Sequence, residues 1–201
     1  MANRADNFNR ADTSGNNIGT PSDGGSAWIN TLSGSWDIGS NQAKETSGTG
    51  QVICVLEAST ALATVQATAT NLGSNAGLVL CVSDDNNYIV GVFAPGFSMA
   101  VYKRVAGSFT QLGSTYGGSI SNGDVFALER DASDNIAFKQ NGVSRVTATD
   151  SFNNTATKHG LRANSDTSVR FDDFSITDNS GGGGGGTVIP VFMNQYRQRW
   201  S

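Results

Sequence analysis

Residues 76–93 read AGLVLCVSDDNNYIVGVF, and this stretch decides the fold class. Two apolar runs, 76–83 and 88–93, flank the four polar residues 84–87. Short apolar runs joined by turn-forming residues are typical of paired antiparallel strands. The segment therefore predicts a β-hairpin.

The same pattern continues outward in both directions. Asn141-Gly142 is a strong signal for a type I′ hairpin turn, and no segment before residue 181 carries a helical stripe longer than two turns. The series predicts an all-β fold of roughly a dozen strands in a closed or two-sheet arrangement. The other expected strands lie in 26–32, 35–45, 50–58, 63–72, 98–105, 109–114, 125–131, 136–140, 143–149, 158–164 and 168–177.

Composition divides the 201 residues into three parts. Residues 1–180 are long enough for one β domain with its own core. Residues 181–186 are six glycines, a composition that predicts a flexible linker. Residues 187–201, TVIPVFMNQYRQRWS, contain no acidic residue and differ in composition from the body. We predict that they form a C-terminal docking peptide.

The docking peptide is expected to anchor the domain to another protein. Phe192, Tyr196 and Trp200 are four residues apart, so on a helix they would share one face and could fill a groove. Residues 187–193 could instead add as a strand to a partner sheet, or the peptide could fold back on its own domain. The predicted partner-binding residues are Val188, Ile189, Val191, Phe192, Met193, Tyr196, Arg197, Arg199 and Trp200.

Charge narrows the range of partners. All 17 acidic residues and 11 of the 13 basic ones precede residue 187, so the body carries 11 − 17 = −6. An acidic body argues against nucleic acid, which requires a basic surface. No stretch approaches 18 apolar residues, so no membrane span is predicted. The first ten residues, MANRADNFNR, lack the apolar core of a secretion signal, and we expect synthesis in the cytoplasm without export.

Several motifs, in order, carry a family resemblance over about residues 5–177. They are DNFNRADTSGNNIGT, GGSAWI and GSWDIGSNQAKE near the start, the hairpin quoted above with MAVYKRVAGSFTQLGS, and IAFKQNGVSRVTATD with KHGLRANSDTSVRFDDFSI near the end. The chain resembles a concanavalin A-like lectin/glucanase (laminin-G-type) jelly-roll domain, of the kind found in phage virion structural proteins. That resemblance implies an antiparallel two-sheet jelly-roll sandwich.

Two functions follow from this resemblance. The first is a non-enzymatic phage virion component, a decoration, cement or fibre-like protein present in several copies. Residues 187–201 would hold it to capsid or tail subunits, and the jelly roll could display a surface for host glycan. The alternative is a free-standing domain that binds carbohydrate or cleaves glycosidic bonds. One fold hosts all of these activities, so the choice between the two functions depends on the residues of the site.

No catalytic residue is predicted. Retaining glucanases of this fold carry Glu-x-Asp-x-Glu, which supplies two carboxylates about 5 Å apart. The nearest match, 129–133, reads ERDAS and lacks the second glutamate, and it falls at a strand end entering a turn. The single histidine, His159, has no accompanying Ser or Cys motif and is interpreted as an ordinary strand residue.

Two weaker site predictions remain. Among the available aromatic residues, Trp28 and Trp36 are assigned to the core, and Phe97 and Tyr116 are the predicted glycan contacts because they lie in turn-like segments.

No cofactor is required, although calcium could bind where acidic residues from the two ends of the domain meet. Cys54 and Cys81 are expected to be buried free thiols, with a disulfide between neighbouring strands as the alternative. The predicted calcium ligands are Asp6, Asp12, Asp172 and Asp173.

Overall fold

The computed structural model describes residues 3–30, 34–47, 49–96 and 98–180. Every regular element in these ranges is a β-strand, which confirms the predicted all-β class. No described helix is long and apolar enough to cross a membrane. The strands are β1 (Arg4–Asp6), β2 (Ile29–Asn30), β3 (Trp36–Gly39), β4 (Gln42–Glu45), β5 (Gln51–Glu57), β6 (Ala63–Asn71), β7 (Ala76–Asp84), β8 (Asn87–Ala94), β9 (Ser98–Val105), β10 (Ser108–Tyr116), β11 (Val125–Arg130), β12 (Asn135–Gln140), β13 (Val143–Thr149), β14 (Lys158–Asn164) and β15 (Arg170–Asp178).

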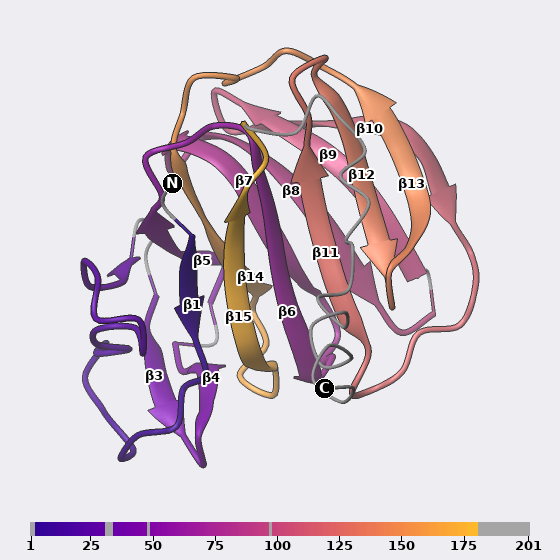
Figure 1. The fold of residues 1–201 in the computed structure, drawn as a ribbon. Coiled ribbons are helices and arrows are strands. Elements are labelled where there is room, and N and C mark those ends of the chain that lie inside the picture. Colours follow the sequence, from indigo (N-terminus) through magenta and orange to yellow (C-terminus); the bar gives the residue numbers. More distant parts are fainter. Residues whose placement is uncertain (1–2, 31–33, 48, 97, 181–201) are drawn as a thin grey trace, which may run out of the picture.

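The strands form two antiparallel sheets that face each other, as a jelly-roll sandwich requires (Figure 1). The eight-stranded sheet runs β13-β12-β11-β6-β15-β4-β3, with β1 paired to β15. The seven-stranded sheet runs β10-β9-β8-β7-β14-β5-β2. Strands β10 and β13, each at the end of its sheet, lie against each other and close one side of the sandwich.

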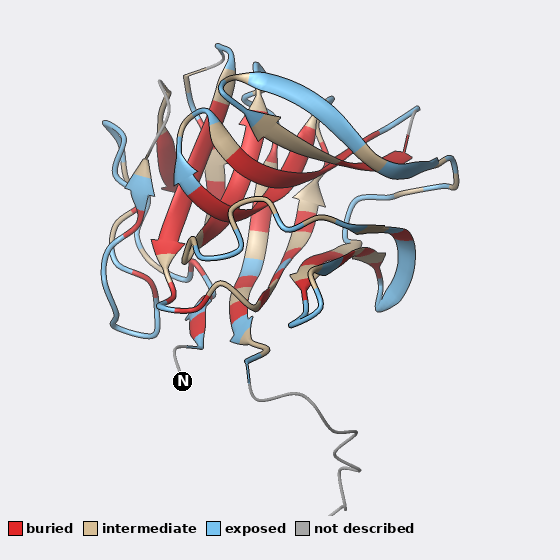
Figure 2. Cartoon of the chain, turned by 90° about the horizontal axis from the view of Figure 1, so that it is seen from above, coloured by how far each residue is buried: buried red, intermediate tan, exposed pale blue. Residues whose placement is uncertain are grey.

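The main core lies between the sheets and is built largely from aromatic rings. Phe93 of the seven-stranded sheet stacks on Phe126 of the eight-stranded sheet, with ring centroids 3.9 Å apart. Trp36 is fully buried beside Phe171, and Trp28 is 7% exposed beside Phe174, so the core assignment of both tryptophans is confirmed. Buried residues follow most of the strands, and exposed residues lie in the connecting loops and along β10 and β13 (Figure 2).

Two tight turns form where the sequence predicts them, whereas a third, at Ser40 and Asn41, divides the predicted strand 35–45 into β3 and β4. β7 and β8 are joined through Asp85 and Asn86, as the opening stretch indicates. At the β12–β13 turn, Asn141 and Gly142 have φ angles of 50° and 79°. Two consecutive positive φ values are the signature of a type I′ turn, which matches the twist of the flanking strands.

Two features differ from simple strand alternation. The short strand β1 was not predicted and pairs with β15. In β15 the register with β6 shifts between Asp172 and Ser175, and Asp173 has a φ of 48°. This bulge places both Phe171 and Phe174 in the core, although three-residue spacing in a regular strand would put them on opposite faces. The predicted linker 181–186 and docking peptide 187–201 lie outside the described residues.

Candidate functional site

The glucanase-like motif does not form a pair of catalytic carboxylates. Glu129 lies near the end of β11 and forms an ion pair with Lys139, with 2.8 Å between nitrogen and oxygen. Asp131 lies in the following turn, where it accepts hydrogen bonds from Asn135 and from the backbone N–H of Ser133. The hydrogen bond from the Asn135 side chain lowers the pKa of Asp131, which favours the ionised form. Asp131 is therefore poorly suited to act as a general acid.

His159 and Cys81 are neighbours but do not form a nucleophile–base pair. The His159 Nδ1 accepts a hydrogen bond from the backbone N–H of Cys81 at 3.1 Å, and its Nε2 lies 2.9 Å from the carbonyl oxygen of Thr60. This geometry assigns the proton to Nε2. Burial lowers the pKa of His159 to about 4 and raises that of the Cys81 thiol to about 11. Both Cys54 and Cys81 are buried free thiols, as predicted.

The four predicted calcium ligands have different surroundings. Buried Asp6 receives hydrogen bonds from Arg10 at 2.6 and 2.9 Å and from the Trp28 indole at 2.8 Å. Asp12 accepts a hydrogen bond from the backbone of Ser40. Asp172 is half-buried, and burial followed by the charge of Asp173 raises its pKa. In the described parts of the chain, no three His, Cys, Asp or Glu side chains are placed to hold a metal ion.

The structure describes only one of the two predicted glycan contacts. Phe97 lies outside the described residues. Tyr116 is half-buried at the end of β10 and packs against the main core. The guanidinium of Arg145 lies 4.8 Å from the centre of its ring. Contacts with the core and with Arg145 therefore occupy much of the ring surface of Tyr116.

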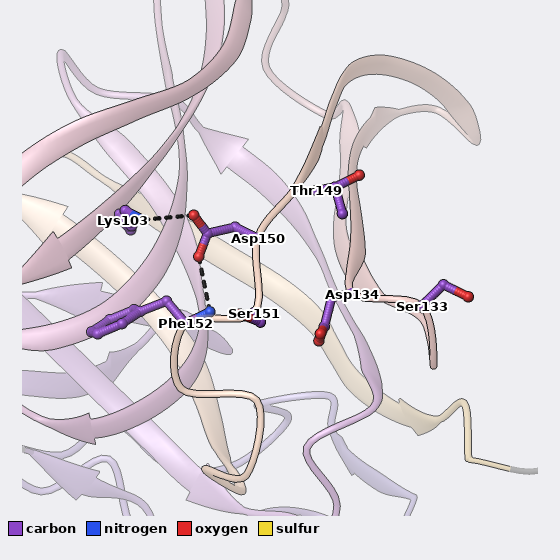
Figure 3. Close-up of a pocket in the computed structure, with 7 residues that line it drawn as sticks. All are labelled: Lys103, Ser133, Asp134, Thr149, Asp150, Ser151 and Phe152. Carbon is purple, nitrogen blue, oxygen red and sulfur yellow. Dashed lines mark hydrogen bonds and ion pairs between the residues drawn. The ribbon is translucent and has the colours of Figure 1, made fainter.

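A shallow hollow of about 570 Å³ lies at the end of the sandwich (Figure 3). Its charged groups are already paired: Lys103 binds Asp150 at 2.7 Å, and Asp134 lies 3.8 Å from the guanidinium of buried Arg130. In the close-up, the carboxylates of Asp134 and Asp150 point in different directions. The lining residues are Lys103, Ser133, Asp134, Thr149, Asp150, Ser151 and Phe152.

A second apolar cluster lies on the outer face of the seven-stranded sheet. Cross-strand partners share a face, so the register places Val79, Val90 and Tyr102 together across β7, β8 and β9. These residues are separate from the core between the sheets. The buried members of this outer cluster are Ile53, Val55, Val79, Val82, Tyr88, Val90, Val92 and Ala100.

Four longer side chains form a distinct surface on this face, which we call the arginine–aromatic surface: Tyr88, Tyr102, Arg104 and Phe109. The register aligns Tyr88 with Arg104 and Arg104 with Phe109. Phe109 meets both tyrosines edge to face with ring centroids 6.3 Å apart. The Arg104 guanidinium lies 5.7 Å from the Tyr88 ring centre and 5.2 Å from that of Phe109. Such geometry allows cation–π attraction.

Exposure within this surface is graded. Tyr88 is buried, Tyr102 and Arg104 are half-buried, and Phe109 is 44% exposed. Burial raises the pKa of the Tyr88 hydroxyl, which therefore stays protonated at neutral pH. The surface thus offers aromatic carbon and guanidinium N–H groups to solvent, and none of its four side chains is a carboxylate. It can stack and donate hydrogen bonds, but it holds no acid–base pair.

Arg162 lies deeper on the same face. Its cross-strand partners are Ile53 and Gly77. Its side chain donates hydrogen bonds to the side-chain oxygens of Gln51, at 2.8 Å, and Asn75. Burial lowers its pKa to about 10, so it stays charged at neutral pH.

Selecting aromatic residues because they lie in turn-like segments did not identify the arginine–aromatic surface. Phe109 and Arg104 flank the turn at Ala106 and Gly107, and pairing the strands around that turn would have aligned them. The sequence signal for this surface is therefore the cross-strand register, which can be found only by pairing two neighbouring strands.

No protein-family model matches the chain, and the comparison with curated proteins gives no match. Solved structures do match. The carbohydrate-binding module CBM66 from Bacillus subtilis is 17% identical with a TM-score of 0.57, over 76% of this chain and 92% of that one. A β-glucanase from Bacillus licheniformis is 14% identical with a TM-score of 0.50, over 89% and 99%.

A GH43 protein from Bacillus licheniformis, BlXynB, is 15% identical with a TM-score of 0.53. The match covers 86% of this chain but only 38% of that protein. At such low identity these likenesses establish shared architecture. The chain has the fold of a concanavalin A-like jelly-roll sandwich.

Proposed function

We propose that the chain is a non-enzymatic glycan-binding jelly roll that residues 187–201 join to a larger assembly. The observation that carries the glycan-binding part is the arginine–aromatic surface. Phe109, with 44% exposure, is presented beside half-buried Tyr102 and Arg104 on one sheet face. Solvent-exposed aromatic rings beside hydrogen-bond donors are what a sugar requires.

The chemistry of a sugar ring fits this surface. One side of a pyranose presents C–H groups, which pack against an aromatic face, and its rim presents hydroxyl oxygens that accept hydrogen bonds. Phe109 and Tyr102 supply aromatic area, and Arg104 supplies guanidinium donors in a fixed planar geometry. The likeness in fold to a carbohydrate-binding module supports the same proposal without identifying a ligand.

The non-enzymatic part rests on how the carboxylates are used. Glycoside cleavage normally needs two carboxylates facing one bond. Glu129 is paired with Lys139, Asp131 is held in a turn, and the arginine–aromatic surface contains none. We therefore expect binding without turnover.

The test of binding is a screen of immobilised glycans followed by titration calorimetry. Phe109→Ala should lower affinity about tenfold or more, as expected for loss of a central aromatic contact. Val143→Ala is the matched control, since Val143 is an exposed apolar residue on β13, with 51% exposure. Equal affinity of both variants and the parent protein would rule out this surface.

The test of turnover is incubation with β-glucans and bacterial surface polysaccharides, followed by reducing-end assay. No new ends should appear. Cleavage that disappears in Glu129→Gln would mean that the protein is a hydrolase.

For the assembly, the setting that we propose is a phage virion. The support comes from the sequence: the resemblance to virion jelly rolls and the hexaglycine segment followed by an apolar, basic peptide. A chain ending at Ser180 should fold but fail to join virions, and Trp200→Ala should weaken attachment without altering the unfolding of the domain. Normal occupancy of virions by the shortened chain would assign attachment to the jelly roll itself.

A further inference from the structure

Two arginines on the outer face of the seven-stranded sheet, Arg104 and Arg162, lack carboxylate partners, whereas Lys158 on the same face is the cross-strand partner of Glu57. Three arginines are buried in the described chain, Arg4, Arg130 and Arg162. Arg4 lies 2.8 Å from Asp23, and Arg130 lies 3.8 Å from Asp134. No described carboxylate lies within 4.0 Å of Arg162, whose side-chain partners are the neutral amides of Gln51 and Asn75. A buried charge with only neutral partners is unusual, because desolvating an ion is costly.

Arg104 repeats this arrangement nearer to solvent. Its Nε donates to the carbonyl oxygen of Gly107 at 3.1 Å, and its Nη1 donates to the carbonyl oxygen of Asp85 at 2.9 Å. Asp85 thus offers Arg104 a backbone oxygen, and no described carboxylate lies within 4.0 Å of the guanidinium. The Nη2 group of Arg104 donates to no described residue. Donors on a half-buried guanidinium therefore remain for a ligand.

The two arginines act on the same region. The Arg104 guanidinium lies 5.7 Å from the centre of the Tyr88 ring, and the positive charge of Arg104 adds to burial in lowering the pKa of Arg162. Their fields therefore add; the charge of Asp85 opposes them at Tyr88, but no described carboxylate lies within 4.0 Å of either guanidinium. Positive potential from fixed guanidinium groups favours an anion that arrives beside them, and Arg binds carboxylates better than other side chains do because its planar fork matches them.

We infer that the arginine–aromatic surface selects glycans that carry carboxylates, with Arg104 as the contact residue and Arg162 as a second, buried charge on the same face. This inference rests on the proposed glycan-binding function and specifies the class of sugar. A sugar acid meets both features of the surface at once, because its ring can stack on Phe109 while its carboxylate reaches Arg104.

An acidic sugar fits this surface better than nucleic acid does. Residues 1–180 carry a net charge of −6, which repels a densely charged polyphosphate at long range. A spaced carboxylate needs only the local field of one or two arginines. Nucleic acid is therefore the competing outcome to be measured.

The experiment compares two ligands that differ in one group: an oligosaccharide that carries a single uronic acid residue, and the same oligosaccharide after chemical reduction of its carboxyl group to an alcohol. The full chain should bind the acidic form at least about tenfold more tightly in calorimetry, since charge-assisted hydrogen bonds are roughly twice as strong as neutral ones. Raising the salt concentration should narrow this preference.

Two variants with the same change of charge locate the effect. Arg104→Gln should remove most of the preference, while Arg145→Gln, on β13 of the other sheet, should keep it. If Arg104→Gln fails to fold by circular dichroism, Arg104→Lys keeps the charge without the fork and should reduce the preference severalfold.

The outcomes separate the inference from the proposed function. If both oligomers bind equally and Phe109→Ala weakens both, the face is a neutral-glycan site and the inference is wrong. If no member of a broad glycan panel binds, the proposed function fails and the inference fails with it. If a single-stranded oligonucleotide binds as tightly as the acidic sugar, the surface recognises anions in general and the inference is also wrong.

Discussion

The outer faces of the two sheets have opposite chemistry although the same fold produces both. On the eight-stranded sheet, β6 alternates between buried Val65 or Ala67 and polar Gln66 or Thr68. On the seven-stranded sheet, β8 is buried on both faces from Tyr88 to Ala94. One outer face is therefore small and polar, and the other is an apolar floor beneath aromatic and arginine side chains.

The arginines follow the same division, although Lys158 and Glu57 are cross-strand partners on the seven-stranded sheet. Glu129 and Lys139 lie on the eight-stranded sheet and form an ion pair at 2.8 Å. Arg104 and Arg162 lie on the seven-stranded sheet and have no described carboxylate within 4.0 Å. A face that serves only to meet water needs neither an apolar floor nor unpaired cations. The difference therefore directs attention to the seven-stranded sheet as the functional face.

The sharpest test of the comparison introduces one charge on each face. Val90→Asp should lower the free energy of unfolding by about 4 kcal/mol or more, because it buries an unpaired carboxylate in the outer cluster. Gln66→Asp, at an exposed site on β6, should change it by less than about 0.5 kcal/mol. Urea unfolding monitors both. Similar losses would mean that the two faces are equally solvated.

Acid should destabilise the domain through β14 of the seven-stranded sheet. His159 is the only histidine, and burial holds its pKa at about 4 in the folded state against an ordinary value of 6.5. Between these two pKa values the unfolded chain binds a proton that the folded chain does not bind. The free energy of unfolding therefore falls as pH drops from about 6.5 toward 4. The total loss should be on the order of 3 kcal/mol.

The measurement is urea unfolding at several pH values between 7 and 4.5. His159→Gln should be less stable than the parent protein but nearly independent of pH in this window. The aspartates whose pKa values are lowered, such as Asp166 at about 2, lose their contribution only at lower pH. A flat profile for the parent protein would contradict neutral burial of His159.

A reciprocal exchange of Val and Thr makes a finer comparison. Val90→Thr should cost about 1–2 kcal/mol, because a hydroxyl enters the fully buried outer cluster without a partner. Thr68→Val, on half-buried β6, should be neutral within about 0.5 kcal/mol, since Val also favours strands. Thermal unfolding of the two variants checks this, and a loss in Thr68→Val equal to that in Val90→Thr would remove the distinction between the faces.

The smallest effect is expected at the ion pair of the eight-stranded sheet. Glu129→Gln should change stability by about 0.5 kcal/mol or less, because partly exposed ion pairs contribute little. It should leave glycan binding unchanged, which titration calorimetry can establish. Reduced binding in this variant would move the functional face to the eight-stranded sheet.

Particular elements show what can be predicted from sequence. The hairpins around residues 84–87 and 141–142 were predicted from turn residues between apolar runs, because their geometry depends on local backbone preference. The bulge at Asp172 and Asp173 could not be predicted in this way. The bulge forms because burying both Phe171 and Phe174 in the core stabilises the fold by more than the shift in register costs in hydrogen bonds between β15 and β6.

The sequence by itself determined the all-β class, most strands and turns, the two core tryptophans and the absence of a complete glucanase motif. These depend on local pattern, which a single chain segment contains. Only the tertiary structure decided that Tyr88, Tyr102, Arg104 and Phe109 meet on one face, and that buried Arg162 shares this face with no described carboxylate within 4.0 Å. The physical reason is that β14 is placed next to β7, and the register between strands fixes which side chains share a face.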